Sequence, residues 1–467
     1  MHGTVVAADL RGILPPTLKS AVEGGATGQD VSITGWVRSV RVQKRIAFAE
    51  VADGSMHQGV QIVMDDPQMA SQLSTGCSVE ITGRLSESPG REQSKEVVAK
   101  EIRIVGGADP ESYPLQKKRH SLEFLREIGH LRPRSQTIGA VTRLRDHAEA
   151  GFHRFFRGNQ FVRVHTPALT SNDCEGGGET FCVAPADVGK RVNADFFGRK
   201  VNLTVSGQLH LEVFTGAFKR AYTFAPAFRA EPSQTGRHLS EFWMVEAECA
   251  FVDRLATLLD VEEEMVRSTT QYLVDTAGND LEFFLRDSEP LSRLVKRLTH
   301  TDQYPRITYS EAIEILQRAE TSGTSFAFSP RWGRGLQSEH ERYLASTHFE
   351  GPVFVTDYPA DIKPFYMLPN EYDSGRTVAC MDLLVPGPCE LLGGSLRDHD
   401  YERIKRRIRD FGIDDGSLDW YAELRRFGTT PHGGFGMGFE RYIQMLTGLE
   451  SVRDIVPFPR HAGRCQY

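Results

Sequence analysis

The sequence lacks the cysteine patterns of zinc sites and disulfide frameworks. Its 7 cysteines are scattered over 467 residues without a Cys-x-x-Cys pair, and an odd, unpaired set suits neither kind of structure. We therefore expect free thiols and a reducing compartment.

Long apolar runs and an excess of basic residues are also missing. No apolar run in the sequence reaches the roughly 18 residues that a membrane span requires, which predicts a soluble protein. The 55 Lys and Arg residues stand against 62 Asp and Glu residues, a net charge of −7. This balance argues against indiscriminate coating of nucleic acid, so a polyanionic partner must meet a local basic patch.

Two kinds of short motif are absent. There is no Gly-x-x-x-x-Gly-Lys-Ser/Thr sequence, so phosphates are not held by a Walker loop. Residues 1–19 include Asp9, Arg11 and Lys19 but no long apolar core, which predicts neither a secretory signal nor a strong transit peptide. Import into an organelle stays an open alternative.

The chain begins with a predicted small barrel. Residues 31–105 contain about five short β-rich runs separated by turns, as in an oligonucleotide-binding barrel. Arg38, Arg41 and further basic residues are expected in the first turn region, followed by Phe48, with Gln61 in the third strand. These residues indicate either a nucleic-acid-binding face or a solvated, charged hairpin with a core phenylalanine.

A second domain follows a predicted hinge. Residues 106–135 are rich in glycine, proline and charge, which is typical of a linker. We therefore predict three segments, 1–105, 106–135 and 136–467. In the last, a helix precedes a strand ending at Pro167, and later helices and strands alternate irregularly. This pattern favours an α+β domain on an antiparallel sheet.

Three segments of the second domain have the residues for phosphate chemistry. FRAE (228–231) and RHLSEF (237–242) have the form of two strands joined by a polar turn, and a fixed arginine can neutralise charge on a phosphate. The sequence GMGFER (436–441) places glycines on a strand just before a helix, where backbone can approach a ligand closely. Asp382 and Glu390 are hard oxygen ligands that suit Mg²⁺. Each segment alone is also compatible with a salt-bridged hairpin or an ordinary glycine-rich turn.

Together, these segments closely resemble the signatures of class II aminoacyl-tRNA synthetases, in the same order. FRAE with RHLSEF is similar to the second signature of the subgroup that charges aspartate, asparagine and lysine. GMGFER is similar to the third, and the helix with Pro167 to the first, which forms the dimer interface in the family. The resemblance implies an N-terminal OB-fold anticodon-binding domain, a class II catalytic domain and a homodimer.

The resemblance also implies the residues that bind ATP. Arg229 would contact the α-phosphate, Phe242 would stack on adenine and Glu231 would contact the adenine. Catalytic roles fall to Arg229, Glu390 and Arg441, and Asp382 with Glu390 would hold Mg²⁺. The ATP-binding set implied in this way is Arg229, Glu231, Arg237, His238, Leu239, Phe242, Glu390, Gly438 and Arg441. In the aspartate-charging enzymes the comparable carboxylates lie one residue closer together.

The amino-acid pocket is predicted to favour asparagine. Glu175 and Gln208 would receive the α-ammonium group, Arg397 would donate to the side-chain oxygen and Glu246 would accept from the amide. Aspartate-charging enzymes have a lysine where this chain has Leu211, so one cation is missing. An aspartate carboxylate would face Glu246 across a buried gap, which is unfavourable.

The expected activity is therefore ATP-dependent activation of L-asparagine and its transfer to tRNA(Asn). Phe48, Gln61 and Arg38 would contact the anticodon. The segments VTDYPADIKPFYM and PHGGFGMGFERY resemble the bacterial and mitochondrial type of asparagine-charging enzyme, which favours the mitochondrial matrix slightly over the cytoplasm. The alternatives are an aspartate-charging enzyme, a non-catalytic nucleic-acid-binding scaffold and an amide-forming synthetase of asparagine, which would not need residues 31–105.

Overall fold

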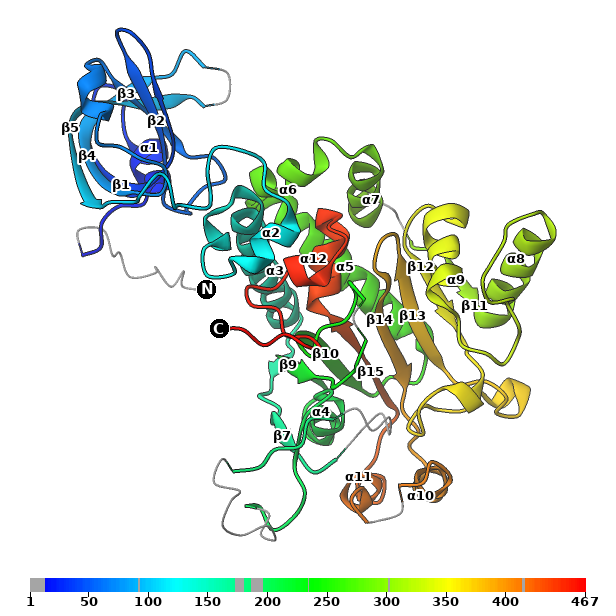
Figure 1. Cartoon of the computed structure of the whole chain (residues 1–467). Coiled ribbons are helices and arrows are strands. Elements are labelled where there is room, and N and C mark those ends of the chain that lie inside the picture. Colours follow the sequence, from blue (N-terminus) through cyan, green and yellow to red (C-terminus); the bar gives the residue numbers. More distant parts are fainter. Residues whose placement is uncertain are drawn as a thin grey trace, which may run out of the picture. The chain divides into compact units, whose positions relative to one another are not determined.

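The computed structural model describes residues 13–90, 93–172, 180–185, 196–233, 235–300, 303–413 and 416–467. The chain forms two compact units, residues 1–140 and 141–467, which are drawn in Figure 1. The dividing point falls inside helix α3 (Gln136–Gly158). Within the described residues, no helix is both long and apolar enough to cross a membrane.

The first unit is a closed five-stranded barrel, as the sequence predicts. Its strands pair in the order β1-β2-β3-β5-β4, and β1 closes on β4. Alternate residues point inward, because the side chains of a strand alternate between its two faces; Ile33, Val51 and Ile62 are among those that fill the interior. The elements of the unit are α1 (Leu18–Gly24), β1 (Asp30–Val42), β2 (Ala47–Ala52), β3 (Val60–Met64), β4 (Ser78–Glu87), β5 (Lys95–Gly106) and α2 (Leu122–Glu127).

One local expectation for the barrel is wrong. Arg38 and Arg41 do not lie in the first turn but in β1, which continues to Val42. The strand is longer than its apolar pattern indicates because it pairs with β2 up to Val42 and Ala47, with a register shift between Val37 and Ser39. This shift is a β-bulge or similar irregularity, which increases local twist.

The second unit is built on an eight-stranded sheet with the order β11-β12-β13-β14-β15-β10-β9-β6. The pairs from β12 to β9 are antiparallel, as expected, whereas β11 and β6 add parallel pairs at the two edges. The sheet is thus mixed. The strands are β6 (Val162–Arg163), β9 (Arg220–Phe228), β10 (Glu241–Ala250), β11 (Arg306–Thr308), β12 (Val353–Thr356), β13 (Cys380–Val385), β14 (Cys389–Leu396) and β15 (His432–Gly438), and β7 (Leu169–Thr170) pairs separately with β8 (Asn202–Leu203).

The strand expected to end at Pro167 is shorter than predicted. Only Val162 and Arg163 form β6, where they pair with β9. A proline has no N–H to donate to a ladder, so the chain leaves the sheet before Pro167. The predicted helix before this strand and the predicted hairpin of β9 and β10 around the polar turn are both confirmed.

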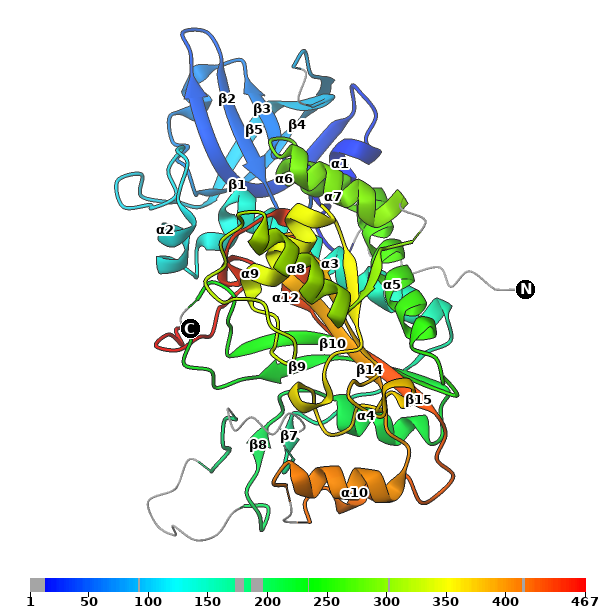
Figure 2. The same ribbon diagram turned by 90° about the vertical axis from the view of Figure 1, so that its right-hand side faces the viewer.

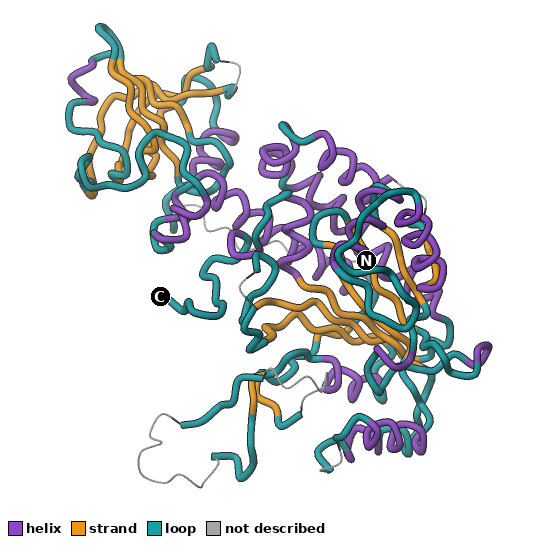
Figure 3. Tube along the Cα trace, turned by 45° about the vertical axis from the view of Figure 1, so that its right-hand side comes forward, coloured by secondary structure: helices purple, strands orange, loops and turns teal. Residues whose placement is uncertain are grey.

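Helices cover both faces of this sheet (Figures 2 and 3). One face packs against α3, α5, α6, α7 and α12 through residues such as Phe152, Leu258 and Ile443. The other face packs against α4, α8 and α10 through residues such as Leu209 and Ile404. These helices are α4 (Gln208–Thr215), α5 (Leu255–Thr276), α6 (Gly278–Leu285), α7 (Glu289–His300), α8 (Tyr309–Thr321), α9 (Ser338–Arg342), α10 (Tyr401–Asp410), α11 (Asp419–Glu423) and α12 (Phe439–Thr447).

Candidate active site on the second sheet

A row of paired residues crosses the second sheet and forms the floor of the candidate site. Asp382 pairs with Gly393, Gly393 with Gly436, and Gly436 with Glu246. Paired residues on neighbouring strands share a face, so two carboxylates flank a floor that has no side chains between them. A Cβ atom on Gly393 would lie 3.0 Å from Asp382 Oδ1, and one on Gly436 would lie 3.0 Å from Met244 Cε. A larger residue at either position would crowd these neighbouring side chains, so glycine allows them to lie close over the backbone of the floor.

A register shift in β14 brings Glu390 to the same face. Glu390 pairs with Leu384, whereas Leu383 pairs with Leu392, so Leu391 is an extra residue. Side chains along a strand alternate between the two faces of the sheet. One extra residue therefore moves the side chains that precede it to the opposite face from the one that strict alternation would give. Glu390 and Asp382 consequently share the site face although eight positions separate them. This explains how the wider spacing still brings the two carboxylates together.

The loop between β9 and β10 brings two arginines to the site. The Arg229 guanidinium lies over the Phe242 ring, with 5.4 Å between Cζ and the ring centroid. The Arg229 N–H donates to the Ser240 carbonyl at 3.1 Å, which fixes the start of the loop. Arg237 Nη2 donates to Cys389 Sγ at 3.4 Å, next to Glu390. Arg229, Arg237, Phe242 and Glu390 therefore meet, as the sequence predicts.

The other predicted nucleotide contacts in this loop have protein partners. His238 Nε2 lies 3.2 Å from Glu231 Oε2, and His238 Nδ1 lies 2.6 Å from Thr235 Oγ1. The Leu239 side chain is buried in an apolar cluster with Val452. Only the backbone of Leu239 can therefore contact a ligand without repacking.

Arg441 and Glu390 form an exposed ion pair at the edge of the floor. Arg441 Nη1 donates to the Glu390 carbonyl at 2.8 Å and lies 3.5 Å from Glu390 Oε2. The two side chains are 37% and 44% exposed, so they remain accessible to a ligand. Gly438, at the end of β15, lies beside Arg441: a Cβ atom on it would be 3.6 Å from Arg441 Cγ.

The carboxylates of the site differ in their readiness to ionise. The positive charges of Arg441, Lys363 and Arg229 lower the pKa of the half-exposed Glu390 carboxyl against the effect of its partial burial. Burial and the charge of Glu390 raise the pKa of Asp382, although Lys363 Nζ lies 2.8 Å from Asp382 Oδ2. Burial, Glu390 and Asp382 raise the pKa of Glu341, on α9, to about 7. The sequence analysis does not identify Lys363 or Glu341 as site residues. Lys363 lies in the segment VTDYPADIKPFYM, whose resemblance to asparagine-charging enzymes does not by itself assign a role to the lysine.

The predicted amino-acid residues lie at the other end of the floor. Glu246 Oε2 accepts from the Gly207 N–H at 2.8 Å, and its Oε1 accepts from the Ser206 hydroxyl. Gln208, the first residue of α4, follows directly. Arg397 packs over the Tyr366 ring at 5.2 Å. Three of the four predicted residues therefore surround one end of the floor, and Glu175 lies outside the described residues.

Two buried carboxylates that the sequence analysis missed hold this end together. Glu248 forms an ion pair with Arg397, and Glu212 Oε1 accepts from Gln208 Nε2 at 3.1 Å. Both carboxylates had a signal in the sequence. Glu248 is two residues after Glu246 on a strand, and Glu212 is four residues after Gln208 on a helix, and both spacings place side chains on one face.

The predicted anticodon residues lie on β1, β2 and β3 of the barrel. Arg41, the partner of Phe48 across β1 and β2, places its guanidinium 5.0 Å from the Phe48 ring centroid. Gln61 Nε2 donates to Glu96 Oε2 at 2.9 Å, and Arg38 Nη1 donates to the His57 carbonyl at 3.2 Å. Phe48 and Gln61 lie on neighbouring strands and are both half-buried. Such strands can present an aromatic ring and an amide to bases.

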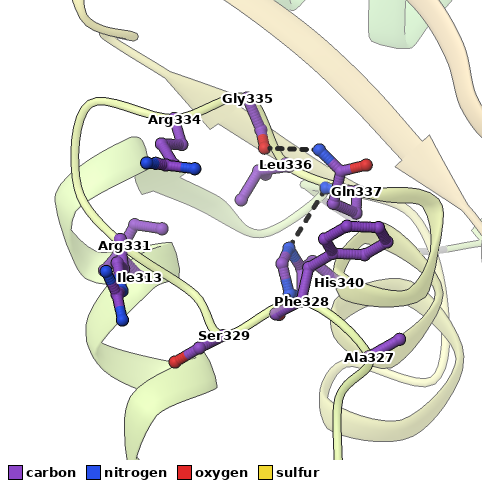
Figure 4. A pocket seen from close by; sticks show the side chains of 10 residues that line it. All are labelled: Ile313, Ala327, Phe328, Ser329, Arg331, Arg334, Gly335, Leu336, Gln337 and His340. Carbon is purple, nitrogen blue, oxygen red and sulfur yellow. Dashed lines mark hydrogen bonds between the residues drawn. The ribbon is translucent and has the colours of Figure 1, made fainter.

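A cavity of about 330 Å³ lies away from this floor, between α8 and α9 (Figure 4). Arg331, Arg334 and Phe328 line it, but no predicted site residue does. Its buried histidine, His340, is satisfied: Nδ1 accepts from the Gln337 N–H at 3.1 Å and Nε2 donates to the Phe328 carbonyl at 2.7 Å. The cavity does not contribute to the candidate site.

Comparison with known proteins agrees with this geometry. Residues 121–462 match the family described as tRNA synthetases class II (D, K and N), and residues 31–105 match the OB-fold nucleic acid binding domain. The asparagine–tRNA ligase of Thermosynechococcus vestitus is 44% identical over an alignment of 464 positions. The alignment covers 96% of this chain and 99% of the relative. The chain belongs to the asparagine–tRNA ligases of class II. A mouse asparaginyl-tRNA synthetase is 45% identical, over 94% of this chain and 92% of its own.

Solved structures of asparaginyl-tRNA synthetases share the fold. The enzyme from Pyrococcus horikoshii complexed with asparaginyl-adenylate superposes with a TM-score of 0.84 at 28% identity, and the match covers 97% of this chain and 99% of that one. Family membership confirms the predicted fold and the predicted class of ligase. The roles of the individual site residues rest on the geometry described above.

Proposed function

We propose that this protein activates L-asparagine with ATP and transfers it to tRNA(Asn). The observation that carries the proposal is the glycine floor between two differently charged ends. Arg229, Arg441 and Glu390 lie at one end, and Glu246 with Arg397 lies at the other. A nucleotide and an amino acid can bind on such a floor with their reacting groups between them.

The arginine end is suited to ATP. Arg229 would contact the α-phosphate, while Arg237 and Arg441 would contact the outer phosphates and Phe242 would stack on adenine. A guanidinium group presents a planar fork to phosphate oxygens and stays charged. Because these groups are held in place before the reaction, they can stabilise the charge that develops on the α-phosphate.

Asp382 and Glu390 fit a Mg²⁺ ion bound together with ATP. Among the described residues, no three His, Cys, Asp or Glu side chains form a ready-made metal cluster. Mg²⁺ commonly needs only one or two carboxylates because substrate phosphates and water complete its coordination. Both carboxylates lie against Gly393 on the site face. A Cβ atom built on Gly393 would lie 3.0 Å from Asp382 Oδ1 and 3.5 Å from Glu390 Oε1. The ion would neutralise phosphate charge there, and Lys363 would have to share Asp382 with it.

The other end would recognise asparagine. Glu175 and Gln208 would bind the α-ammonium group, Arg397 would donate to the side-chain oxygen and Glu246 would accept from the amide. Arg397 Nε and Nη2 donate hydrogen bonds to Glu248, and Nη1 donates one to Ser395 Oγ. The guanidinium has five N–H donors, so one N–H on each Nη has no hydrogen bond in the described part of the chain and can face a ligand.

The reaction needs no covalent enzyme intermediate. The asparagine carboxylate attacks the α-phosphorus, and the bond from the α-phosphorus to the oxygen that bridges it to the β-phosphorus breaks. Pyrophosphate departs, and asparaginyl-adenylate is formed. A hydroxyl of the terminal tRNA ribose then attacks the acyl carbon and AMP leaves. The protein orients the reactants and stabilises charge, and positioning alone can supply several kcal/mol, on the order of 7–11.

The barrel would provide the anticodon contacts. Phe48 would stack on an anticodon base, while Gln61 and Arg38 would bind polar groups of the nucleic acid. Arg41 beside Phe48 supports this assignment because it adds positive charge to the stacking surface. Without such contacts, an isolated aminoacylation site could not select tRNA(Asn) by its anticodon.

Charging of purified tRNA transcripts tests the proposed function. We expect radiolabelled asparagine to accumulate on tRNA(Asn) in the presence of ATP and Mg²⁺, with much less on tRNA(Asp). Transfer of aspartate to tRNA(Asp) with equal efficiency would refute the assignment. Omission of Mg²⁺ should abolish charging if the ion acts with ATP.

We also propose a homodimer and, with a slight preference over the cytoplasm, the mitochondrial matrix. Exposed Val162 and Leu169, at 43% and 42%, lie in the region that resembles the dimer-forming signature and support self-association. Light scattering should give twice the chain mass of 52.3 kDa. Import of the full chain into isolated mitochondria tests the compartment, and lack of import would favour the cytoplasm.

A further inference from the structure

Glu212 is a fully buried carboxylate that links several residues around the proposed amino-acid pocket. Its side chain is 0% exposed. It accepts hydrogen bonds from Gln208 Nε2 at 3.1 Å, Tyr421 Oη at 2.8 Å, Arg425 Nη2 at 2.8 Å and His432 Nε2 at 3.1 Å. A buried charge is tolerated when its lone pairs are satisfied in this way. One carboxylate thus fixes a substrate-binding residue and two basic groups.

His432 lies between two oxygen acceptors. Its Nδ1 lies 2.9 Å from the Thr430 carbonyl oxygen, and its Nε2 lies 3.1 Å from Glu212 Oε2. The imidazole ring is therefore held against the Glu212 carboxylate.

Glu212 remains ionised. Burial would raise the pKa of Glu212, but the charge of Arg425, the hydrogen bond with His432 and the charge of Arg397 outweigh it and hold the pKa far below its usual value. The carboxylate is therefore a fixed negative charge at neutral pH.

Arg397 lies between Glu212 and a second carboxylate. Its Nε is 3.8 Å from Glu212 Oε1, and both Nε and Nη2 of its guanidinium donate to the Glu248 carboxylate. Ser395 Oγ accepts a further bond from Nη1 at 2.7 Å. Arg397 is consequently held in one orientation, with the remaining donors of its Nη groups available to the pocket.

Glu212 is a fixed negative charge close to the arginines of the pocket. Its carboxylate forms an ion pair with Arg425 and lies 3.8 Å from Arg397 Nε, and Glu248 forms a second ion pair with Arg397. Loss of the Glu212 charge would make the local potential more positive, which would favour a carboxylate over a neutral amide.

We propose that Glu212 is a specificity-determining and positioning residue: it supplies the negative charge that makes the pocket prefer asparagine over aspartate, and it orients Gln208 and Arg397. The proposal rests on the function proposed above. It goes beyond direct substrate contact, because Glu212 lies behind the residues that would touch the amino acid.

The test compares pyrophosphate exchange with asparagine and with aspartate in the full-length protein. Glu212→Gln keeps the size of the side chain but removes its charge. We expect kcat/KM for asparagine to fall and the aspartate-to-asparagine ratio of kcat/KM to rise about tenfold or more, since the cluster gains one positive charge in a low-dielectric site. Adding Arg425→Gln to this variant removes one positive charge as well, and the ratio should return toward that of the wild type.

Tyr421→Phe is the matched control. It removes a hydrogen bond from the same carboxylate but changes no charge, so activity with both amino acids should fall in parallel. If Glu212→Gln does not fold, Glu248→Gln assayed at pH 8, where Glu248 is ionised, removes a neighbouring negative charge and should also raise the ratio.

Two results would overturn the proposal. One is an unchanged aspartate-to-asparagine ratio in the folded charge variant; the other is an equal rise in Tyr421→Phe. Both are distinct from failure of the proposed function, in which the wild-type protein itself would show no asparagine-dependent exchange.

Discussion

Arg229 provides the most direct perturbation of the proposed chemistry. Its guanidinium lies over Phe242 and close enough to Glu390 to lower the pKa of that carboxyl. Replacement by alanine removes the group that would stabilise charge on the α-phosphate and leaves the sheet below it intact. We expect Arg229→Ala to abolish asparagine-dependent pyrophosphate exchange.

The magnitude follows from two separate effects. Loss of a preorganised electrostatic contact raises the activation barrier by about 3 kcal/mol or more, which lowers the rate by two orders of magnitude or more. Loss of the contact with Phe242 should lower the free energy of unfolding by only about 0.5–1 kcal/mol, because a partly exposed cation–π pair is weak. The variant should therefore fold normally.

Exchange of labelled pyrophosphate into ATP at saturating asparagine measures the effect, with circular dichroism as a check on the fold. Arg220→Ala is a suitable control, since Arg220 begins β9, the strand that ends just before Arg229, but donates to the Asn159 carbonyl at 2.8 Å in an exposed position. Arg229→Lys should recover only part of the activity because an ammonium group lacks the planar fork. Near-normal exchange by a folded Arg229→Ala protein would refute the reasoning.

Three other side chains give tests that do not involve Arg229. Glu262 is fully buried, neither of its carboxyl oxygens has a hydrogen bond within the described ranges, and burial raises its pKa well above the usual value. The folded state therefore keeps a proton that the unfolded chain loses as pH rises above about 4.5, so stability falls with pH. Glu262→Met should raise the free energy of unfolding by about 1–3 kcal/mol, and by more at pH 8 than at pH 5; a lower urea midpoint at both pH values would contradict this. Phe48→Ala should raise KM for tRNA about tenfold and leave pyrophosphate exchange unchanged, since one stacked base contributes about 1–3 kcal/mol; normal charging at limiting tRNA would exclude the role. Burial and the charge of Glu212 raise the pKa of Glu248 to about 7 against the effect of Arg397, so its negative charge is lost below that pH. The aspartate-to-asparagine ratio of kcat/KM should therefore fall as pH rises from 6 to 8, and a ratio independent of pH would argue against an electrostatic role for Glu248.

The barrel and the central sheet could be predicted because their signals are local. Short alternating runs separated by turns define β1 to β5, and the glycines before Phe439 mark the end of β15 and the start of α12. The edge strands could not be predicted in the same way. Strands β6 and β11 have two and three residues, and their parallel pairing depends on chain segments distant in the sequence.

The phosphate-binding end of the candidate site could be predicted because its arginines and its glutamate lie in recognisable sequence motifs. Arg229, Arg237, Glu390 and Arg441 converge as the resemblance implies. The buried partners Glu212 and Glu248 were missed because spacing places them on the same face as Gln208 and Glu246 but does not show which charged groups they will contact. Glu212 acquires its role only when α4 packs against Arg425 and His432, more than 200 residues later in the chain. Such long-range ion pairs are a property of tertiary packing.

The central claim is that one pocket on this sheet activates asparagine and rejects aspartate. The most direct measurement is pyrophosphate exchange by the wild-type protein with the two amino acids side by side, at equal concentrations and a fixed pH of 7.5. The account predicts rapid exchange with asparagine and little above background with aspartate. Equal rates, or faster exchange with aspartate, would contradict it.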